Sequence, residues 1–210
     1  MAERHEEKYL IDYRQYALLK ARAGQVLTPD PHGQNGSYTI TSLYYDDLKN
    51  TALLEKQDGL PVHTKFRLRT YDANADLIRL ERKVKQGIMT QKQSAVILKD
   101  QLAFLGMPGW DLAKLSEDAQ PLALQMLSGG MRPATAIRYR RDAFLFPGTD
   151  LRLTFDMGLE VLPPDILLPS FVRLVQPFGQ YLIDSLPHQN LQGICYHYLL
   201  IPSGLPNKFF

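Results

Sequence analysis

Charged side chains occupy every second position in several short segments of this sequence. In one of them, Lys65, Arg67 and Arg69 alternate with Phe66 and Leu68. Because successive side chains of a strand point to opposite faces, this spacing predicts a strand with one charged and one apolar face. Three further segments place charged side chains on one face in the same way: Arg4, Glu6 and Lys8; Arg79, Glu81, Lys83 and Lys85; and Arg152 with Asp156.

The function of these charged faces depends on whether they are exposed to solvent or lie next to one another in a sheet. For a single strand, a charged face is most simply a solvated face. Side by side, strands with three basic residues over 65–69 and two more at Lys83 and Lys85 would concentrate positive charge, which is unfavourable unless an anion is bound. In a closed barrel these faces would line a tunnel, where arginine forks and lysine point charges hold phosphate oxygens from all sides. The pattern therefore favours a phosphate-binding interior.

Two glutamates share these faces with the basic residues. Glu6 lies between Arg4 and Lys8, and Glu81 lies two residues before Lys83. Inside a tunnel their negative charge would repel a polyanion. It becomes favourable if the carboxylates bind a hard divalent cation, Mn²⁺ or Mg²⁺, that also bridges to phosphate. We therefore predict Glu6 and Glu81 as metal ligands.

The segment near residue 140 allows two assignments. Tyr139 and Arg141 share one face of the expected strand, whereas Arg138 and Arg140 share the other. Both pairs fit a period of two, so the pattern leaves open which arginine faces the predicted site.

Runs of β-branched and aromatic residues, separated by turn residues, predict a chain made mostly of strands. The expected strands cover residues 3–11, 37–46, 62–71, 76–86, 88–97, 134–146 and 150–157. Asp12 is placed to cap a helix over 13–27, a short helix is expected over 47–56, and two more are expected within 98–128. Strands with helices in their connections define an α+β protein. The predicted fold is an antiparallel β-barrel tunnel.

Composition narrows the classes of function. The 210 residues are 45% hydrophobic and 22% charged, as in a soluble globular protein, and the formal net charge is only +2. A broad nucleic-acid-binding surface usually brings a larger basic excess, so no nucleic-acid partner is expected. The single cysteine, Cys195, excludes an internal disulfide. A charged N-terminus and the lack of an apolar run of about 20 residues predict a cytoplasmic protein without a membrane span, to which a membrane-associated partner protein could still bind.

The last quarter of the chain has a different composition. Residues 161–210 are rich in proline, leucine and glutamine, and their only charged side chains are Asp165, Arg173, Asp184 and Lys208. We therefore predict a tunnel domain over 1–160 and an atypical tail over 161–210, which stands in place of the closing tunnel strands. A barrel that is incompletely closed at its C-terminal end would follow.

Seven short motifs appear in an order that resembles a known family. They are Arg4–Tyr9, Ser42–Asp46, Lys65–Tyr71, Leu80–Lys83, Lys92, Tyr139–Phe144 and Arg152–Asp156. Together they cover about residues 3–157 and are similar to the VTC domain, the polyphosphate polymerase branch of the triphosphate tunnel metalloenzymes in the CYTH-like superfamily. Each motif alone is weak, whereas the ordered set is fairly specific.

The resemblance implies that the triphosphate of ATP lies in the tunnel and that its γ-phosphate is transferred to a polyphosphate chain. ATP and polyphosphate would then be the partners. By matching position, the resemblance implies that Lys8, Arg67, Arg69, Lys83 and Arg141 are catalytic residues that hold phosphates, and that Lys92 and Tyr139 also contact phosphate. The strand faces add Arg4, Lys65, Lys85 and Arg152 to this predicted set.

The tail departs from the family pattern, so more than one function and more than one origin of the tail stay possible. The family has a late strand of the form Glu-Val-Lys-Tyr and a final one with Ser-Lys-Tyr. The nearest segments here are Arg173–Gln176 and Tyr196–Tyr198, which lack the glutamate and both lysines. The tail is therefore either a natural variant or out of frame. An ATP-dependent polyphosphate polymerase is the first hypothesis. A triphosphatase on the same barrel and a module that binds phosphate chains without turnover are the alternatives.

Overall fold

The computed structural model of the chain describes residues 5–71, 77–87, 89–105, 111–149, 151–162 and 195–201. The strands are β1 (His5–Ile11), β2 (Thr28–Pro29), β3 (Ser37–Asp46), β4 (Val62–Tyr71), β5 (Leu77–Gln86), β6 (Met89–Leu98), β7 (Arg132–Leu145), β8 (Arg152–Leu162) and β9 (Cys195–Ile201). The α-helices are α1 (Tyr13–Val26), α2 (Thr51–Gln57) and α3 (Gln120–Ser128), and the 3-10 helices are η2 (Lys99–Leu105) and η3 (Leu112–Lys114).

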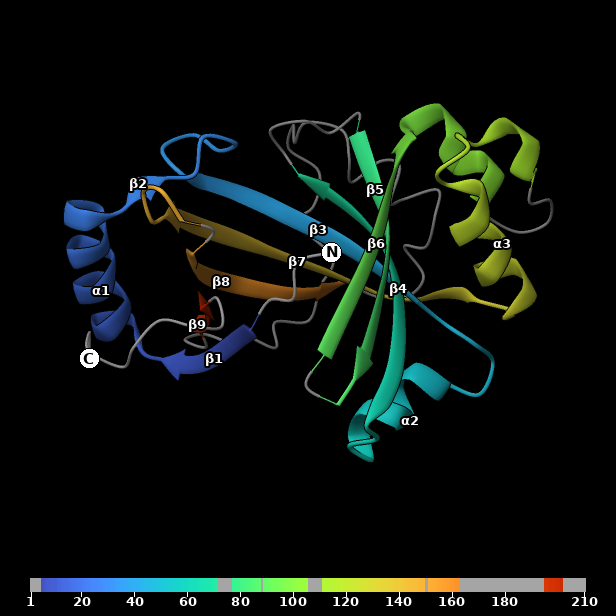
Figure 1. The fold of residues 1–210 in the computed structure, drawn as a ribbon, viewed down its shortest axis with the longest axis horizontal. Helices are drawn as coiled ribbons and strands as arrows, with labels where there is room; N and C mark the ends of the chain where they lie inside the picture. Colours follow the sequence, from blue (N-terminus) through green and yellow to red (C-terminus); the bar gives the residue numbers. More distant parts are fainter. Residues whose placement is uncertain are drawn as a thin grey trace, which may run out of the picture. The chain divides into compact units, whose positions relative to one another are not determined.

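The strands follow the order β1-β9-β8-β7-β3-β4-β5-β6, and β2 pairs with β7 (Figure 1). Every pair with a described register is antiparallel. The predicted α+β class with helices in the connections is thereby confirmed. The two helices expected within 98–128 are instead η2, η3 and α3 in the described part. Pro121 is the second residue of α3, in the first turn of the helix, where proline is tolerated.

The chain divides into two compact units. The first contains β1, α1, β2, β9, the part of β7 from Tyr139 onward, and β8 as far as Glu160. The second contains β3 from Ile40 onward, α2, β4, β5, β6, the 3-10 helices, α3, and the part of β7 up to Arg138. Each unit therefore has its own packed side chains and its own charged groups.

The second unit buries the apolar face of its sheet beneath helices. Phe66 and Leu68 of β4 are at most 4% exposed, and they pack with Leu80 of β5. Against this face lie the apolar side chains of the helical segments, among them Leu122 and Met126 of α3, which lies beside β5 and β6 in Figure 1. The alternation predicted from the sequence is therefore confirmed here. Because side chains alternate, Arg67 and Arg69 of β4 and Glu81 and Lys83 of β5 belong to the opposite face of the sheet. Arg82 instead shares the face of Leu80 and lies over the ring of Phe66.

The first unit is built around α1. Asp12 caps this helix as expected: its Oδ1 accepts a hydrogen bond of 2.8 Å from the backbone N–H of Gln15, and its own N–H donates one of 3.0 Å to the Gln15 side chain. One buried face of the helix packs Tyr16 against Phe155, edge to face at 5.4 Å, and Phe155 in turn packs against Phe144 at 6.0 Å. This aromatic cluster joins α1 to β7 and β8.

The tail supplies one described strand. β9 lies between β1 and β8, with Tyr198 opposite both Lys8 and Thr154. The Tyr196–Tyr198 segment, which stands where the family has its final strand, is therefore in a strand, while Arg173–Gln176 lies outside the described residues. The proposed boundary near residue 160 stays a prediction. Among the helices that the structure describes, none is long and apolar enough to cross a membrane.

Candidate functional site

Basic side chains meet in register on the charged face of the second unit. Lys65 of β4 lies opposite Lys83 of β5, and Lys83 lies opposite Lys92 of β6. Like charges directly opposite one another in a sheet are destabilising, so an anion near this row is favourable. The hairpins β4–β5 and β5–β6 thus bring together three lysines that the sequence analysis assigned to phosphate.

Glu81 is the negative centre of this face. Its side chain is 2% exposed, and its Oε2 lies 2.7 Å from Nη2 of Arg67 and 3.9 Å from Nε of Arg69. The ammonium of Lys92 lies 2.5 Å from the other oxygen, Oε1. Three predicted phosphate ligands therefore converge on one carboxylate. The carboxylate oxygens lie among these cations as the oxygens of a bound phosphate would.

The electrostatics of Glu81 follow from these contacts. Burial alone raises the pKa of the Glu81 carboxyl, but Arg67, Arg69 and Lys92 outweigh that effect and lower the pKa to about 2. The carboxylate therefore carries its full charge at neutral pH. Three cations thus lie around this one carboxylate.

Two residues that the sequence analysis left out of the site orient the arginines. Tyr44 lies opposite Arg67 on β3, and its hydroxyl accepts a hydrogen bond of 3.2 Å from Nη1 of that arginine. Ser42 lies opposite Arg69, and its hydroxyl accepts a hydrogen bond of 3.4 Å from Nε. The available signal was again the period of two, because Ser42 and Tyr44 share one face of β3.

The first unit pairs Arg141 with a carboxylate of its own. Nε and Nη2 of Arg141 donate to the two oxygens of Asp156 at 2.6 and 2.7 Å, and Nη2 also donates to the Tyr139 hydroxyl at 3.4 Å. Burial lowers the pKa of Arg141, but the hydrogen bond to Asp156 and the charge interactions with Tyr139 and Asp156 together outweigh burial, so the pKa is raised. Arg140 is exposed; its Nη2 contacts Sδ of Met157, and its Nε lies 3.8 Å from Oδ1 of Asp142. Of these two neighbouring arginines, Arg141 is the one that shares its surroundings with Tyr139.

Arg152 also pairs with a buried carboxylate of the first unit. Its Nη2 forms an ion pair with Oδ2 of Asp30, a fully buried carboxylate. The other oxygen of Asp30 accepts a hydrogen bond of 3.0 Å from the backbone N–H of His32 and lies 2.7 Å from Nδ1 of the same histidine. Burial raises the pKa of Asp30, yet the His32 hydrogen bonds and the Arg152 charge together lower it. Asp30 was not singled out by the sequence, because it lies in an expected loop.

A third buried carboxylate, Asp142, joins α1 to β7. It accepts hydrogen bonds from the hydroxyls of Tyr16 at 2.7 Å and Ser37 at 2.8 Å, and it forms an ion pair with Lys20. Burial raises the pKa of Asp142, but these partners outweigh burial and lower it. Asp142 follows Arg141 directly and therefore lies on the other face of β7, where its role is structural.

For several of the remaining predicted residues, the side chains lie outside the described part of the chain. Glu6 and Lys8 lie in β1, but their side chains are outside the described part, and so is Arg4. Lys85 is exposed near the end of β5. Within the described residues, no three histidine, cysteine, aspartate or glutamate side chains gather as metal ligands. Both oxygens of Glu81 already face cations, so the described residues by themselves do not form a metal centre, and the Glu6–Glu81 pair stays a prediction.

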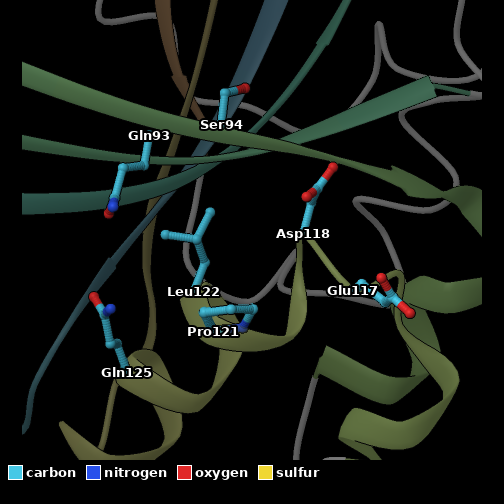
Figure 2. Close-up of a pocket in the computed structure, with 7 residues that line it drawn as sticks. All are labelled: Gln93, Ser94, Glu117, Asp118, Pro121, Leu122 and Gln125. Atoms are coloured by element: carbon cyan, nitrogen blue, oxygen red, sulfur yellow. The ribbon is translucent and has the colours of Figure 1, made fainter. Parts of the chain in front are cut away.

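A pocket of about 420 Å³ lies where the edge strand β6 meets the start of α3. Gln93 and Gln125 line one end of it, and Glu117 and Asp118 line the other (Figure 2). Its lining contains two carboxylates and no basic side chain, so its electrostatic potential opposes a phosphate chain. The candidate site is therefore the charged face of β4–β6, not this pocket.

A family model of the VTC domain matches residues 3–180 of the sequence. The chain belongs to the VTC domain family. The resemblance drawn from the ordered motifs is thereby confirmed, and the match extends beyond residue 157 into the tail. No curated protein matches the sequence of this VTC-domain chain.

Solved structures agree on the fold of this VTC-domain chain. A protein from Hippeastrum that is provisionally named an adenylyl cyclase, and described as having a dominant triphosphatase activity, has a TM-score of 0.55 at 15% identity. The comparison covers 96% of this chain and 80% of that one. A protein from Bacillus halodurans, provisionally named an adenylate cyclase, has a TM-score of 0.52 at 12% identity over 97% of this chain and 83% of that one. The chain thus has the triphosphate tunnel fold, as predicted.

Proposed function

We propose that the charged face of β4, β5 and β6 binds a chain of phosphates. The observation that carries this proposal is the convergence of Arg67, Arg69 and Lys92 on one carboxylate within 3.9 Å. Cations that already surround one oxyanion can surround a phosphate oxygen with little rearrangement, and arginine adds the forked geometry that phosphate favours. The in-register lysines Lys65 and Lys83 extend the same charge along the sheet.

Membership of the VTC family supports a specific activity, ATP-dependent polyphosphate synthesis. In that reaction a terminal oxygen of the polyphosphate chain forms a bond to the γ-phosphorus of ATP. The bond between this phosphorus and its bridging oxygen breaks, the electron pair leaves with ADP, and the chain grows by one phosphate. Transfer of this kind needs positioning and charge neutralisation more than covalent help. Arg67, Arg69 and Lys92 supply both from this chain.

Several parts of the proposal rest on the sequence alone. Phosphate contacts from Arg4, Lys8, Lys85, Tyr139, Arg141 and Arg152 stay predictions, as does the cytoplasmic location. We also expect turnover to require Mn²⁺ or Mg²⁺, because phosphate oxygens and carboxylates are the ligands that such hard cations prefer. Addition of EDTA during the assay tests this requirement, and an unchanged rate would contradict it.

A triphosphatase is the second candidate. The Hippeastrum protein of the same fold is described as having this activity, which favours it over other reactions of ATP. In hydrolysis, water takes the place of the polyphosphate oxygen as the attacking group. Chromatography of the products from labelled ATP separates the candidates: long chains support the polymerase, and orthophosphate alone supports the triphosphatase. Binding without either product would leave a phosphate-binding module.

The binding half of the proposal is tested by Arg67→Ala combined with Arg69→Ala. Loss of two arginine contacts should weaken tripolyphosphate binding at least about a hundredfold, measured by titration calorimetry. Lys49→Ala combined with Lys56→Ala is the matched control, since it removes the same charge from exposed positions in and beside α2. Equal binding by the two double variants would show that the charged face is not the site. Circular dichroism confirms that both are folded.

A further inference from the structure

Glu81 has an unusual position for a residue in a phosphate site, because its charge has the same sign as the ligand. It lies in the middle of β5, opposite Arg67 on one side and Ser94 on the other. Its side chain is almost fully buried, so it cannot leave the site by turning into solvent. Any anion that contacts Arg67 or Lys92 must therefore share these cations with the Glu81 carboxylate.

The Glu81 carboxylate reduces the repulsion between the arginines when no anion is bound. The side chain of Arg69 is only 10% exposed and that of Arg67 only 20%, so water screens their mutual repulsion poorly. Glu81 offsets one of the positive charges and accepts a hydrogen bond of 2.7 Å from Nε of Arg67. The same contacts oppose the ligand, since a phosphate chain must displace them or add its charge beside them.

We propose that Glu81 is a built-in counterion of the phosphate site, which stabilises the empty site and competes with the phosphate chain for Arg67, Arg69 and Lys92. This inference rests on the proposed function of the charged face. It assigns Glu81 a role in setting the affinity threshold: a short anion with few contacts gains little over the carboxylate, whereas a long chain also reaches the row of lysines Lys65 and Lys83.

The competing interpretation makes Glu81 a metal ligand. For that role its oxygens would have to give up their contacts with Arg67 at 2.7 Å and with Lys92 at 2.5 Å and bind the metal instead. The described residues also offer no second and third carboxylate or imidazole beside it. The two interpretations predict opposite outcomes when a carboxylate is removed from this face or added to it.

The test is binding of tripolyphosphate to the full chain, with EDTA and separately with Mg²⁺, measured by titration calorimetry. Glu81→Gln keeps the shape of the side chain and removes its charge. In EDTA it should bind about tenfold more tightly than the natural chain, because one negative charge at contact distance from the ligand is lost. Weaker or unchanged binding in EDTA, or a loss confined to the Mg²⁺ experiment, would overturn the counterion role.

A second variant tests the counterion role even if Glu81→Gln is unstable. Ser94→Glu adds a carboxylate at the exposed position opposite Glu81, whereas Gln93→Glu adds the same charge one residue away, on the other side of β6 (Figure 2). The counterion role predicts about tenfold weaker binding for Ser94→Glu and no change for Gln93→Glu. Tighter binding of Ser94→Glu in Mg²⁺ would instead support a metal ligand.

Failure of this inference differs from failure of the proposed function. If the natural chain binds tripolyphosphate and the Arg67→Ala, Arg69→Ala double variant does not, the site stands whatever Glu81 does. If neither chain binds, or both bind equally, the site itself is wrong.

Discussion

The two units of the chain carry similar buried charges but balance them differently. In the first unit, three buried carboxylates face separate cations: Asp156 faces Arg141, Asp30 faces Arg152, and Asp142 faces Lys20, with Nε of Arg140 at 3.8 Å from Asp142. In the second, Arg67, Arg69 and Lys92 share the single carboxylate of Glu81. The feature that distinguishes the second unit is therefore the convergence of three cations on one buried carboxylate.

The comparison predicts that arginines of the two units have different functions, and a pair of single substitutions tests this most strongly. Arg141→Ala leaves Asp156, which is 4% exposed, without the partner that binds both its oxygens, and should lower the free energy of unfolding by about 3–5 kcal/mol. Arg67→Ala leaves Glu81 with two cations and should lower it by less than about 1 kcal/mol. Urea denaturation measures both. Equal losses would remove the distinction between the units.

A second substitution tests whether the carboxylates of the first unit are structural. Asp142→Asn keeps the shape of the side chain but loses the charge that Lys20, Tyr16 and Ser37 contact, so stability should fall by about 2 kcal/mol. Asp111→Asn, in an exposed ion pair with Lys114 at 3.7 Å, is the control and should change stability little. Tripolyphosphate binding by the folded Asp142→Asn chain should be unchanged. A large loss of affinity would contradict a purely structural role.

The pH dependence of stability gives a further test of the role of Glu81. The pKa of Glu81 is about 2 in the folded chain and lower than in the unfolded one, so its contribution to stability is complete above about pH 4.5 and is lost as the pH falls toward 2. In Glu81→Gln, the dependence of the unfolding free energy on pH should be shallower in this window by up to about 1.4 kcal/mol per pH unit. Thermal denaturation across this pH range measures it. The lowered pKa values of Asp30 and Asp142 should keep some acid sensitivity in the variant.

The smallest expected effect concerns the core of the second unit. The Tyr45 side chain is 3% exposed, and its buried hydroxyl has no hydrogen-bond partner among the described residues. Tyr45→Phe removes this unpaired group and should raise stability by about 1 kcal/mol, without changing tripolyphosphate affinity. A loss of stability in chemical denaturation would show that the hydroxyl has a partner in solution.

The sequence predicted most of the strands and the two faces of the second unit, because a period of two is a local property of the chain. Phe66 and Leu68 lie in the core, while Arg67 and Arg69 lie on the charged face, as the alternation requires. The family was also predicted correctly from the order of its motifs.

Partners that depend on register between distant segments could not be predicted. Nothing in the local sequence indicates that Asp30 meets Arg152 or that Asp142 meets Lys20, since each pair is separated by 122 residues. The role of Glu81 was equally hidden. A glutamate among basic residues predicts a metal ligand or an ion pair equally well until the register brings Lys92 to within 2.5 Å of it.

The succession of two hairpins has a consequence for how the site forms. β4, β5 and β6 follow one another directly, and the turn into β6 contains Gly87 with a positive φ of 60°. Among the described residues, the ion pairs of Glu81 all come from within residues 67–92, so these contacts are close in sequence. Structures rich in local contacts form fast. We therefore expect the charged face of β4–β6 to assemble during synthesis, before the ribosome has completed the strand β9 that lies beside β1.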